Sequence, residues 1–230
     1  MSSEMLFVVL MLLDLLFVLV AFKLGKHFLF AALVANIMFT NMTSSKIITV
    51  FGLDSTVANV FYASIFLATD LLSEHYGKKS AYRGIWLGFF ALVPIILFAP
   101  FVKAFAPAPY SADVSEALAV IFGKTARIAI ASLVAYIASN RCDVWWYHQI
   151  MKRLPQKKWI WLRNNGSTIV SQCIDNTLFV LLAFAGEVPT AVLWQIWLSG
   201  YIIKVIVAVC DTPFVYVSML FKPLDLRNGK

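Results

Sequence analysis

Residues 5–22, with the sequence MLFVVLMLLDLLFVLVAF, form an apolar stretch whose single charge is Asp14. A bilayer core about 30 Å thick is spanned by about 20 apolar helical residues, so this stretch predicts a transmembrane helix. No basic segment precedes it and no small-residue cleavage site closes it, which argues against a signal peptide. Further spans are predicted at residues 28–45, 55–73, 84–105, 124–150, 164–185 and 190–211.

The composition is typical of an all-α integral membrane protein. Hydrophobic residues make up 61% of the 230-residue chain and charged residues 13%, against about 45–50% and about 25% in soluble proteins. No polar linker is long enough to divide the chain, so we expect one domain. The three cysteines lie inside apolar stretches at uneven spacing, which predicts neither a disulfide framework nor a metal site.

Basic residues gather in the loops after the odd-numbered spans and in the C-terminal tail. Because Lys and Arg are enriched on the cytoplasmic side of membrane proteins, we expect an external N-terminus and a cytoplasmic C-terminus. This distribution accounts for the net charge of +7 without a compact basic face, so no nucleic-acid partner is expected. The residues concerned are Lys23, Lys26, Lys78, Lys79, Arg83, Lys152, Arg153, Lys157, Lys158, Arg163, Lys222, Arg227 and Lys230.

Among the charged residues inside predicted spans, Asp70, Arg127, Asp175 and Lys204 lie on four different spans and away from their cytoplasmic ends. Charges in hydrocarbon are costly and usually mark a substrate or ion pathway, so they favour a transporter with a polar, overall neutral interior. Two interpretations of the cations stay open, because they either contact the substrate or only balance the acids. Lys204 and Asp175 can change protonation when buried, whereas Arg127 cannot. We expect Lys204 to pair with Asp175 or Asp70.

Asp70 and Glu74 lie four residues apart and therefore share one helix face. Two carboxylates placed in this way can accept paired N–H donors from a substrate, or they can share a proton. For Glu74 the alternative is a solvated position at the helix end, since Gly77 follows shortly after it.

Other polar residues in the spans have less certain roles. Asn41 lies beside a stripe of amides and hydroxyls that includes Asn36, and these side chains either line a substrate cavity or hold helices together. Asp143 and Asp211 fall near predicted cytoplasmic ends, where we expect solvent or basic loops to compensate them. Asp14 is expected to make a helix contact outside the site.

Two segments share the pattern Ser-x-x-x-Asp. Ser139 and Asp143 end the fifth predicted span, and Ser171 and Asp175 lie inside the sixth. Each pair occupies one helix face, although five residues make only a short repeat. Between the spans we expect a short extended segment at residues 47–52 and an interfacial loop at 106–123, and we expect Pro213 to bend or stop the last helix.

Several kinds of function lack a motif in this sequence. It contains no phosphate-binding glycine-rich loop, no HExxH and no metal-spaced set among His27, His75 and His148. We therefore expect neither an enzyme nor a bound cofactor or metal. If ATP drives the protein, another subunit must supply it.

The charged segments resemble a known family. Thr69-Asp70 followed by Glu74 and Tyr76-Gly77 is similar to the T-D-x-x-x-E-x-Y-G signature of the queuosine precursor transporters, also called vitamin uptake transporters. Four further elements match in order and spacing over residues 36–216, with Asn140 in place of the family's Gln. They are Arg127 with Ala131, Ser132, Ser139 and Asp143; Ser171, Asp175, Asn176 and Phe179; Tyr201, Lys204, Thr212, Pro213 and Tyr216; and Asn41 with Lys46.

This resemblance implies a six-helix core similar to the substrate-binding subunits of energy-coupling-factor transporters. Residues 1–26 would then be an additional N-terminal transmembrane helix, 27–221 the core and 222–230 a cytoplasmic tail. It also implies import of a 7-deazaguanine base across the bacterial inner membrane. The substrate-binding candidates are Asp70, Glu74, Asp175, Asn176, Lys204, Arg127 and Asn41.

Two functional interpretations remain. The first is a secondary importer, and the alternative is a binding subunit of an ATP-driven complex, with Ala31, Ala32 and Ala35 as a docking face. Association with a second copy is left open. Two departures from the family pattern are Ala63 in place of a frequent Pro and the additional first span.

Overall fold

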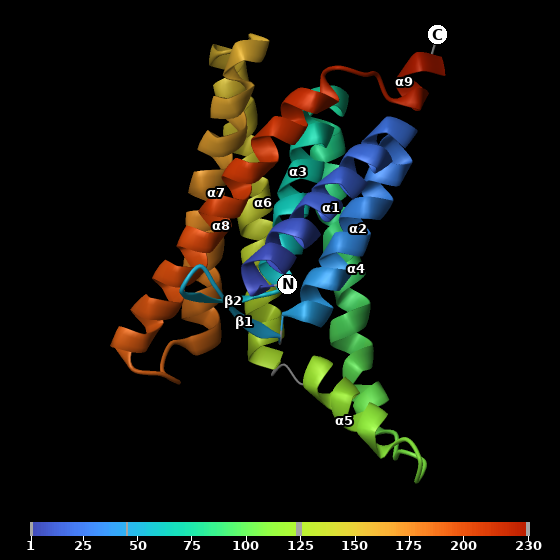
Figure 1. Ribbon diagram of the computed structural model, residues 1–230, viewed down its shortest axis with the longest axis vertical. Helices are drawn as coiled ribbons and strands as arrows, with labels where there is room; N and C mark the ends of the chain where they lie inside the picture. Colours follow the sequence, from blue (N-terminus) through green and yellow to red (C-terminus); the bar gives the residue numbers. More distant parts are fainter. Residues whose placement is uncertain (1, 45, 123–125, 229–230) are drawn as a thin grey trace.

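The computed structural model describes residues 2–44, 46–122 and 126–228 of the chain. Within these ranges seven helices have 18 or more residues and pack into one elongated bundle (Figure 1). They are α1 (Ser3–Leu24), α2 (Lys26–Thr43), α3 (Ala58–Tyr76), α4 (Lys78–Ala104), α6 (Ala126–Arg153), α7 (Ile160–Phe184) and α8 (Thr190–Ser218).

Shorter elements close the two ends of the bundle. The hairpin of β1 (Ile47–Val50) and β2 (Leu53–Thr56) and the helix α5 (Ala112–Ile121) lie at one end. The helix α9 (Leu224–Asn228) lies at the other, and a single 3-10 turn at Lys157–Trp159 precedes α7. We call these the hairpin end and the tail end.

Four of the described helical segments have the length and apolar composition needed to cross a membrane, by these two criteria alone. They are Ser3–Leu24, Lys78–Ala104, Lys157–Phe184 and Thr190–Ser218. The remaining long helices, α2, α3 and α6, contain 18, 19 and 28 residues and carry much of the polar interior. A mostly helical protein with several long apolar helices is therefore confirmed.

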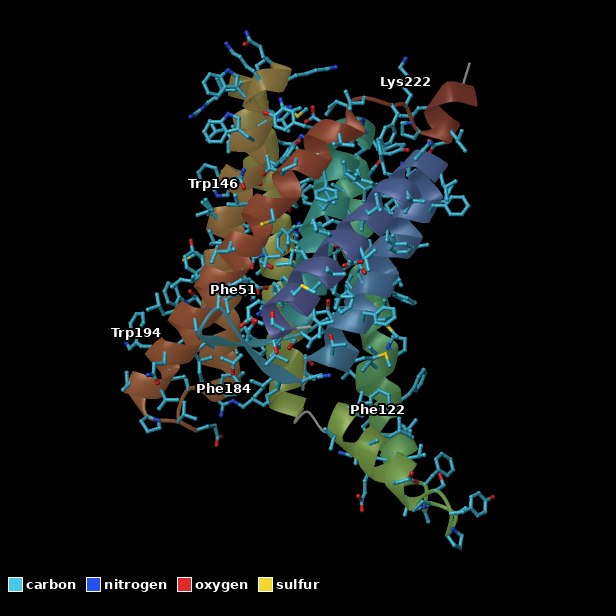
Figure 2. The ribbon with its side chains drawn as sticks, in the orientation of Figure 1. Phe51, Phe122, Trp146, Phe184, Trp194 and Lys222 are labelled. Atoms are coloured by element: carbon cyan, nitrogen blue, oxygen red, sulfur yellow. The ribbon has the colours of Figure 1, made fainter. Side chains whose placement is uncertain are left out.

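The bundle is apolar outside and partly polar inside. Large hydrophobic side chains such as Leu13, Phe90 and Phe101 are exposed on its surface, as expected where lipid is the solvent. Trp194 lies near the hairpin end, and Lys222 lies at the tail end (Figure 2). Aromatic and basic side chains at the ends of the helices are typical of the membrane–water interface.

Helix α3 lies at the centre of the bundle. It contacts α1, α2, α4, α6 and α8, and every residue from position 63 to position 73 is buried. A helix that is covered on all sides can hold polar side chains only where neighbouring helices supply their hydrogen-bond partners or opposite charges. The position of α3 therefore explains why its acidic residues meet side chains from several other helices.

Helix α1 is also part of this packing. It contacts α2 and α3, and Leu15, Val18 and Phe22 are fully buried. Asp14 is also buried, with 7% of its surface exposed, in the part of α1 that packs against α2 and α3. The expected helix contact of Asp14 is therefore confirmed.

Several local expectations can now be checked. The extended segment at 47–52 is confirmed as the first strand and turn of the hairpin, in which Ile47 is paired with Thr56. Phe51 and Gly52 both have positive φ, 53° and 73°, which is typical of tight hairpin turns. The interfacial loop instead contains α5. The expected start of the fifth span at Lys124 lies outside the described residues.

The last two spans are longer than expected. Helix α7 begins at Ile160 rather than at Asn164, so that its first turn includes Arg163. Helix α8 continues through Pro213 to Ser218, so of the two expectations for Pro213, a bend or a stop, the stop is wrong. Packing against α3 and α7 stabilises the continuous helix in spite of the missing N–H group.

The tail returns to the start of α2. The carboxylate of Asp225 accepts hydrogen bonds from the backbone N–H of Lys26 and from the Tyr76 hydroxyl, both at 2.8 Å. Because Gly25 precedes α2 with a φ of 121° and offers no side chain, Asp225 performs the N-cap function from nearly 200 residues away.

Candidate functional site

Helices α6 and α7 exchange hydrogen bonds between the two Ser-x-x-x-Asp segments. The Ser139 hydroxyl of α6 donates to Asp175 of α7 at 3.0 Å, and the Ser171 hydroxyl of α7 donates to Asp143 of α6 at 3.1 Å. All four residues are buried. This reciprocal pattern requires antiparallel helices, and it creates two carboxylate sites along one interface.

The first of these sites is the Asp175 centre, where four helices meet. Oδ1 of Asp175 accepts from Ser139 and from the Tyr62 hydroxyl of α3, the latter at 2.8 Å. Oδ2 accepts from Lys204 Nζ of α8 at 2.6 Å. Lys204 also lies 4.8 Å from the centre of the Tyr62 ring. The expected pairing of Lys204 with Asp175 is therefore confirmed.

The Asp175 centre is almost completely buried. The side chains of Asp175 and Lys204 are 3% and 11% exposed, and an ion pair with so little water is held by its additional hydrogen bonds. A small cavity of about 10 Å³ adjoins it, lined by Lys204, Tyr62, Phe66 and Gln172 among others. Such a volume holds about one water molecule.

Gln172 is a polar residue of this region that the sequence analysis did not select. Its Oε1 is buried and has no hydrogen-bond partner among the described residues. It lies one residue from Ser171 in the α7 motif, so the nearby pattern pointed to the region but not to this side chain.

The second site is the Asp143 centre, which brings carboxyl groups together instead of pairing a carboxylate with a lysine. Oδ1 of Asp143 accepts from Ser171 and Thr168, and its carboxyl interacts with that of Asp70 on α3. Asp211 of α8 adds a third carboxylate nearby, held by a 2.6 Å hydrogen bond from Asn164 Nδ2. The three aspartates are fully buried.

These positions correct an expectation for Asp143 and Asp211. Neither residue is solvated or paired with a basic loop, because both have no exposed surface. The helices α6 and α8 continue for several residues beyond them, to Arg153 and Ser218. Both carboxylates therefore lie inside the bundle.

Glu74 belongs to a neighbouring ion pair toward the tail end. It accepts from Arg163 at 2.8 Å and from the Tyr147 hydroxyl at 2.6 Å. The Arg163 side chain is only 1% exposed and also donates to the carbonyls of Leu154 and Pro155. Glu74 is thus not a freely solvated residue, and Arg163 is an interior cation that the sequence analysis placed in a loop.

The structure places Arg127 at the hairpin end rather than in the interior. Its guanidinium donates to Glu187 at 2.9 Å and to the carbonyls of Leu182 and Ala185. It therefore binds the carbonyls at the C-terminal end of α7, where a positive charge is favourable. The expected balance of Arg127 and Lys204 against Asp70 and Asp175 is wrong in this respect.

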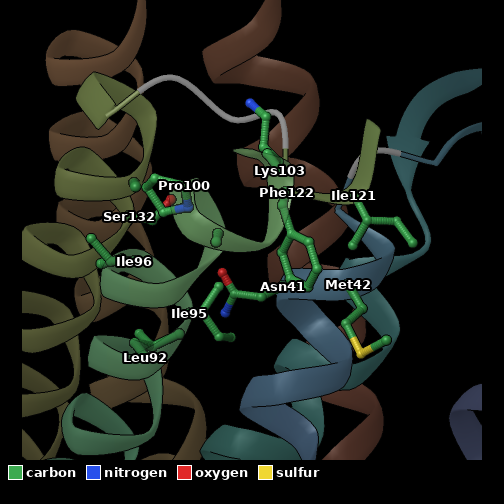
Figure 3. Close-up of a pocket in the computed structure, with 12 residues that line it drawn as sticks. Asn41, Met42, Leu92, Ile95, Ile96, Pro100, Lys103, Ile121, Phe122 and Ser132 are labelled. Atoms are coloured by element: carbon green, nitrogen blue, oxygen red, sulfur yellow. The ribbon is translucent and has the colours of Figure 1, made fainter. Parts of the chain in front are cut away.

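Asn41 lines a different and larger cavity, of about 190 Å³ (Figure 3). Asn41 and Met42 of α2 border it together with Leu92 of α4, Ser132 of α6 and Phe122, which directly follows α5. Its wall is mostly apolar. The cavity lies toward the hairpin end and is distinct from the two carboxylate centres.

Asn176 follows Asp175 in the sequence, but its side chain joins α7 to α8 instead of contacting the Asp175 centre. Its Nδ2 donates to the carbonyl of Trp197 on α8, and its Oδ1 lies against Gly200. A Cβ at position 200 would come within 3.0 Å of this oxygen, so Gly200 permits the close approach of α7 and α8. Of the seven predicted residues, Asp175 and Lys204 thus form one centre, while Asp70 and Glu74 lie in adjacent clusters.

A helical bundle with an apolar exterior and buried carboxylates balanced by lysine and arginine defines the class of multi-pass membrane transporters. The chain belongs to the family described as “Putative vitamin uptake transporter”, which it matches over residues 56–218. The matched segment contains all three aspartates of the Asp143 centre and all residues of the Asp175 centre.

Two curated relatives extend this finding. The chain is 39% identical over 206 residues, 89% of each protein, to a “Probable queuosine precursor transporter” of Bacillus subtilis. It is 28% identical over 167 residues to the “Queuosine precursor transporter” of Escherichia coli, covering 70% of this chain and 71% of that protein. No solved structure gave a significant match.

Proposed function

We propose that this protein is a secondary importer of queuosine precursors, with a 7-deazaguanine base as its substrate. The observation that carries the proposal is the 39% identity to a probable queuosine precursor transporter along nearly all of both chains. The buried Asp175 centre supports it, since a polar ligand can cross a bilayer only where such groups replace its water.

We assign substrate recognition to the Asp175 centre. A guanine-like base presents two parallel N–H donors that one carboxylate can accept, and a carbonyl oxygen that suits an ammonium group. Asp175 and Lys204 supply these groups, while Phe66 and Tyr62 offer aromatic surface beside the small cavity. Gln172 adds an unpartnered acceptor. Arg127 and Asn41 would act at the hairpin end, on the way to this centre.

Binding in this position requires the bundle to open. A cavity of about 10 Å³ is far smaller than the few hundred Å³ of common ligand sites. The Asp175–Lys204 ion pair joins α7 to α8, so a base that replaces this bond would let the two helices separate. The compact arrangement is then a closed one, in which the ion pair holds the two helices together.

The arrangement in the membrane follows from the charge distribution. We place the hairpin end outside and the basic tail end in the cytoplasm of a bacterial inner membrane, which puts the N-terminus outside and the C-terminus inside. The six helices α2, α3, α4, α6, α7 and α8 would form a core like that of the energy-coupling-factor binding subunits. Helix α1 would be a seventh span.

Packing supports a self-contained transporter over an ATP-dependent subunit. Of the three alanines of the docking face considered above, Ala32 is buried, Ala35 is half-buried and Ala31 is exposed. Helix α1 also packs against α2. A partner ATPase would therefore meet a surface that is already partly occupied.

Uptake by the purified protein in liposomes without ATP tests the proposal. We expect entry of a radiolabelled 7-deazaguanine base, with competition by excess unlabelled base. Asp175→Asn should reduce uptake about tenfold to a hundredfold, because an amide presents a donor to an N–H edge. The matched control is Asp113→Asn on exposed α5, which should leave uptake unchanged. Uptake that appears only with an added ATPase would contradict the secondary mechanism.

A further inference from the structure

We propose that Asp70 and Asp143 together bind one proton and form a coupling site separate from the Asp175 centre. This inference rests on the proposed transport function and names the ion that drives it. The ligand is a proton shared between two carboxyl oxygens, so that the pair carries one negative charge instead of two.

The first support is the absence of donors around Asp70. Among the described residues, neither oxygen of Asp70 has a hydrogen-bond partner, although the residue is fully buried on the central helix. Oδ2 of Asp143 is likewise buried without a partner. The bond from the Tyr147 hydroxyl of α6 to Glu74 of α3, at 2.6 Å, sets these two packed helices in register. One turn earlier on each helix, Asp143 and Asp70 therefore lie beside each other, and their carboxyls interact. A proton bound to one carboxyl is donated in a hydrogen bond to the other, and it thus supplies the donor that the unpartnered oxygens of both carboxylates lack among the described residues.

The second support is the distribution of cations. Lys204 is bonded to Asp175 at 2.6 Å, and Arg163 is bonded to Glu74 at 2.8 Å. The part of the chain that the structure describes shows no ion pair with Asp70, Asp143 or Asp211. An uncompensated charge in the bilayer interior costs about 3 kcal/mol or much more. Fewer than three negative charges can therefore remain here.

The third support comes from Asn164, which is not acidic. It is fully buried, and its Nδ2 donates to Asp211 while its Oδ1 has no partner among the described residues. This amide oxygen lies beside a carboxyl cluster and lacks a hydrogen-bond donor among the residues described. Its position therefore suits a neighbouring carboxyl group that carries a proton. The oxygen can accept a hydrogen bond from a protonated carboxyl, although it cannot take up the proton itself.

The groups around Asp70 come from several helices. Asp143 and Tyr147 belong to α6, Asp211 to α8, and Glu74 lies one turn along α3, where it neutralises Arg163 of α7. The remaining helices packed on α3 contribute charges only further away. Asp14 of α1 interacts near Ser64, toward the hairpin end, while Lys26 of α2 and Lys78 of α4 lie at the aromatic rings of Tyr76 and Tyr82.

A proton needs fewer ligands than a metal cation, which requires several oxygen ligands that converge on one point. In the described part of the chain, no group of three His, Cys, Asp or Glu side chains is arranged to hold a metal ion. Two facing carboxyls need nothing more than the proton itself. A sodium ion held by hydroxyl and carbonyl oxygens is the alternative that the transport test below distinguishes.

The reciprocal serine bonds connect this site to the substrate site. Ser139 and Asp143 are four residues apart on α6, about 6 Å along the helix, and each contacts a different centre. If substrate at Asp175 shifts α6 against α7, the bond from Ser171 to Asp143 must change as well. Protonation and substrate binding can thus influence each other through one interface.

The test compares accumulation with exchange in proteoliposomes. An inwardly directed proton gradient of one pH unit should raise the accumulation of a labelled 7-deazaguanine base about tenfold if one proton accompanies each substrate. Asn has nearly the shape of a protonated Asp, so Asp70→Asn and Asp143→Asn should abolish this response. Both variants should retain exchange of external for internal base within several-fold, and Asp113→Asn should behave as the wild type.

A second measurement needs no substrate. Infrared difference spectroscopy of the membrane-embedded protein should show the band of a protonated carboxyl group, weakened in Asp70→Asn and in Asp143→Asn but not in Asp113→Asn. A spectrum unchanged in both variants would overturn the proton site. If wild-type protein transports no 7-deazaguanine while the band behaves as expected, the proposed function fails and the proton site stands.

Three transport results would also overturn the inference. They are accumulation driven by a sodium gradient, exchange without a response to any gradient, and loss of exchange in both variants at normal thermal stability. The last result would assign Asp70 and Asp143 to substrate binding. If one variant fails to fold, the other decides the outcome, since each removes one partner of the same pair.

Discussion

The Asp175 centre and the Asp143 centre arise from the same local sequence pattern but have opposite electrostatic surroundings. Both aspartates are buried and accept a serine hydroxyl from the facing helix. Asp175 also meets Lys204, whereas Asp143 meets Asp70 and the nearby Asp211. The difference comes entirely from α3 and α8. Identical motifs therefore acquire different chemistry from the helices packed against them.

Replacement of Lys204 should have the largest effect and would remove the difference between the centres. Lys204→Met leaves the buried Asp175 carboxylate without its cation, which should abolish uptake and destabilise the protein by about 3–5 kcal/mol. The double variant Lys204→Met with Asp175→Asn should recover most of the stability but no uptake. Thermal unfolding in detergent and liposome uptake measure the two effects. Equal stability of the single and double variants would contradict a buried ion pair.

Replacement of Ser139 or Ser171 should have an effect of intermediate size, and the two variants form a matched comparison of the centres. Ser139→Ala removes a hydrogen bond to a charged carboxylate, worth about 1.5–3 kcal/mol, and should lower substrate affinity. Ser171→Ala removes a bond to Asp143, which keeps its bond from Thr168, so we expect about 1 kcal/mol and little change in affinity. Binding titration and thermal unfolding of both variants separate them. The reverse order of affinities would place the substrate at the Asp143 centre.

Arg127 should give the smallest effect, because it belongs to neither centre. Its side chain is 42% exposed and that of Glu187 is 65% exposed, and exposed ion pairs contribute about 0–1 kcal/mol. Arg127→Ala should thus reduce uptake less than about threefold, with a small loss of stability from the freed α7 carbonyls. A loss as severe as that of Lys204→Met would show that the substrate depends on this end of the bundle.

The sequence predicted the helical membrane architecture and the central ion pair. Long apolar stretches and the cost of isolated charges in hydrocarbon sufficed for both, and Lys204 indeed meets Asp175. The Ser-x-x-x-Asp repeat also pointed to the interface of α6 and α7. The exchange of hydrogen bonds between the two motifs depends on how α6 and α7 are positioned relative to each other. A local sequence pattern does not contain this information.

Errors at helix ends account for the residues that were misplaced. Arg163 and Asp211 were assigned to a loop and to a helix end because the expected spans were several residues too short. A hydropathy pattern ends a predicted span at the first polar residues. It therefore places polar residues such as these outside the helix even where the helix continues. Tertiary packing extends the helices and buries them. Gln172 was missed because an amide leaves no charge signal.

The hydrogen bonds of Asp225 to Lys26 and Tyr76 have a consequence for synthesis. Burial alone would raise the pKa of this carboxyl, but the Lys26 N–H and the Tyr76 hydroxyl outweigh it and hold the pKa below its usual value. This contribution is therefore present above about pH 4 and is lost only as the pH falls through the lowered value. The ribosome delivers Lys26 long before Asp225, so the first turn of α2 remains uncapped until synthesis has passed residue 225. The start of α2 thus acquires its cap only after the helices between these two residues have been made.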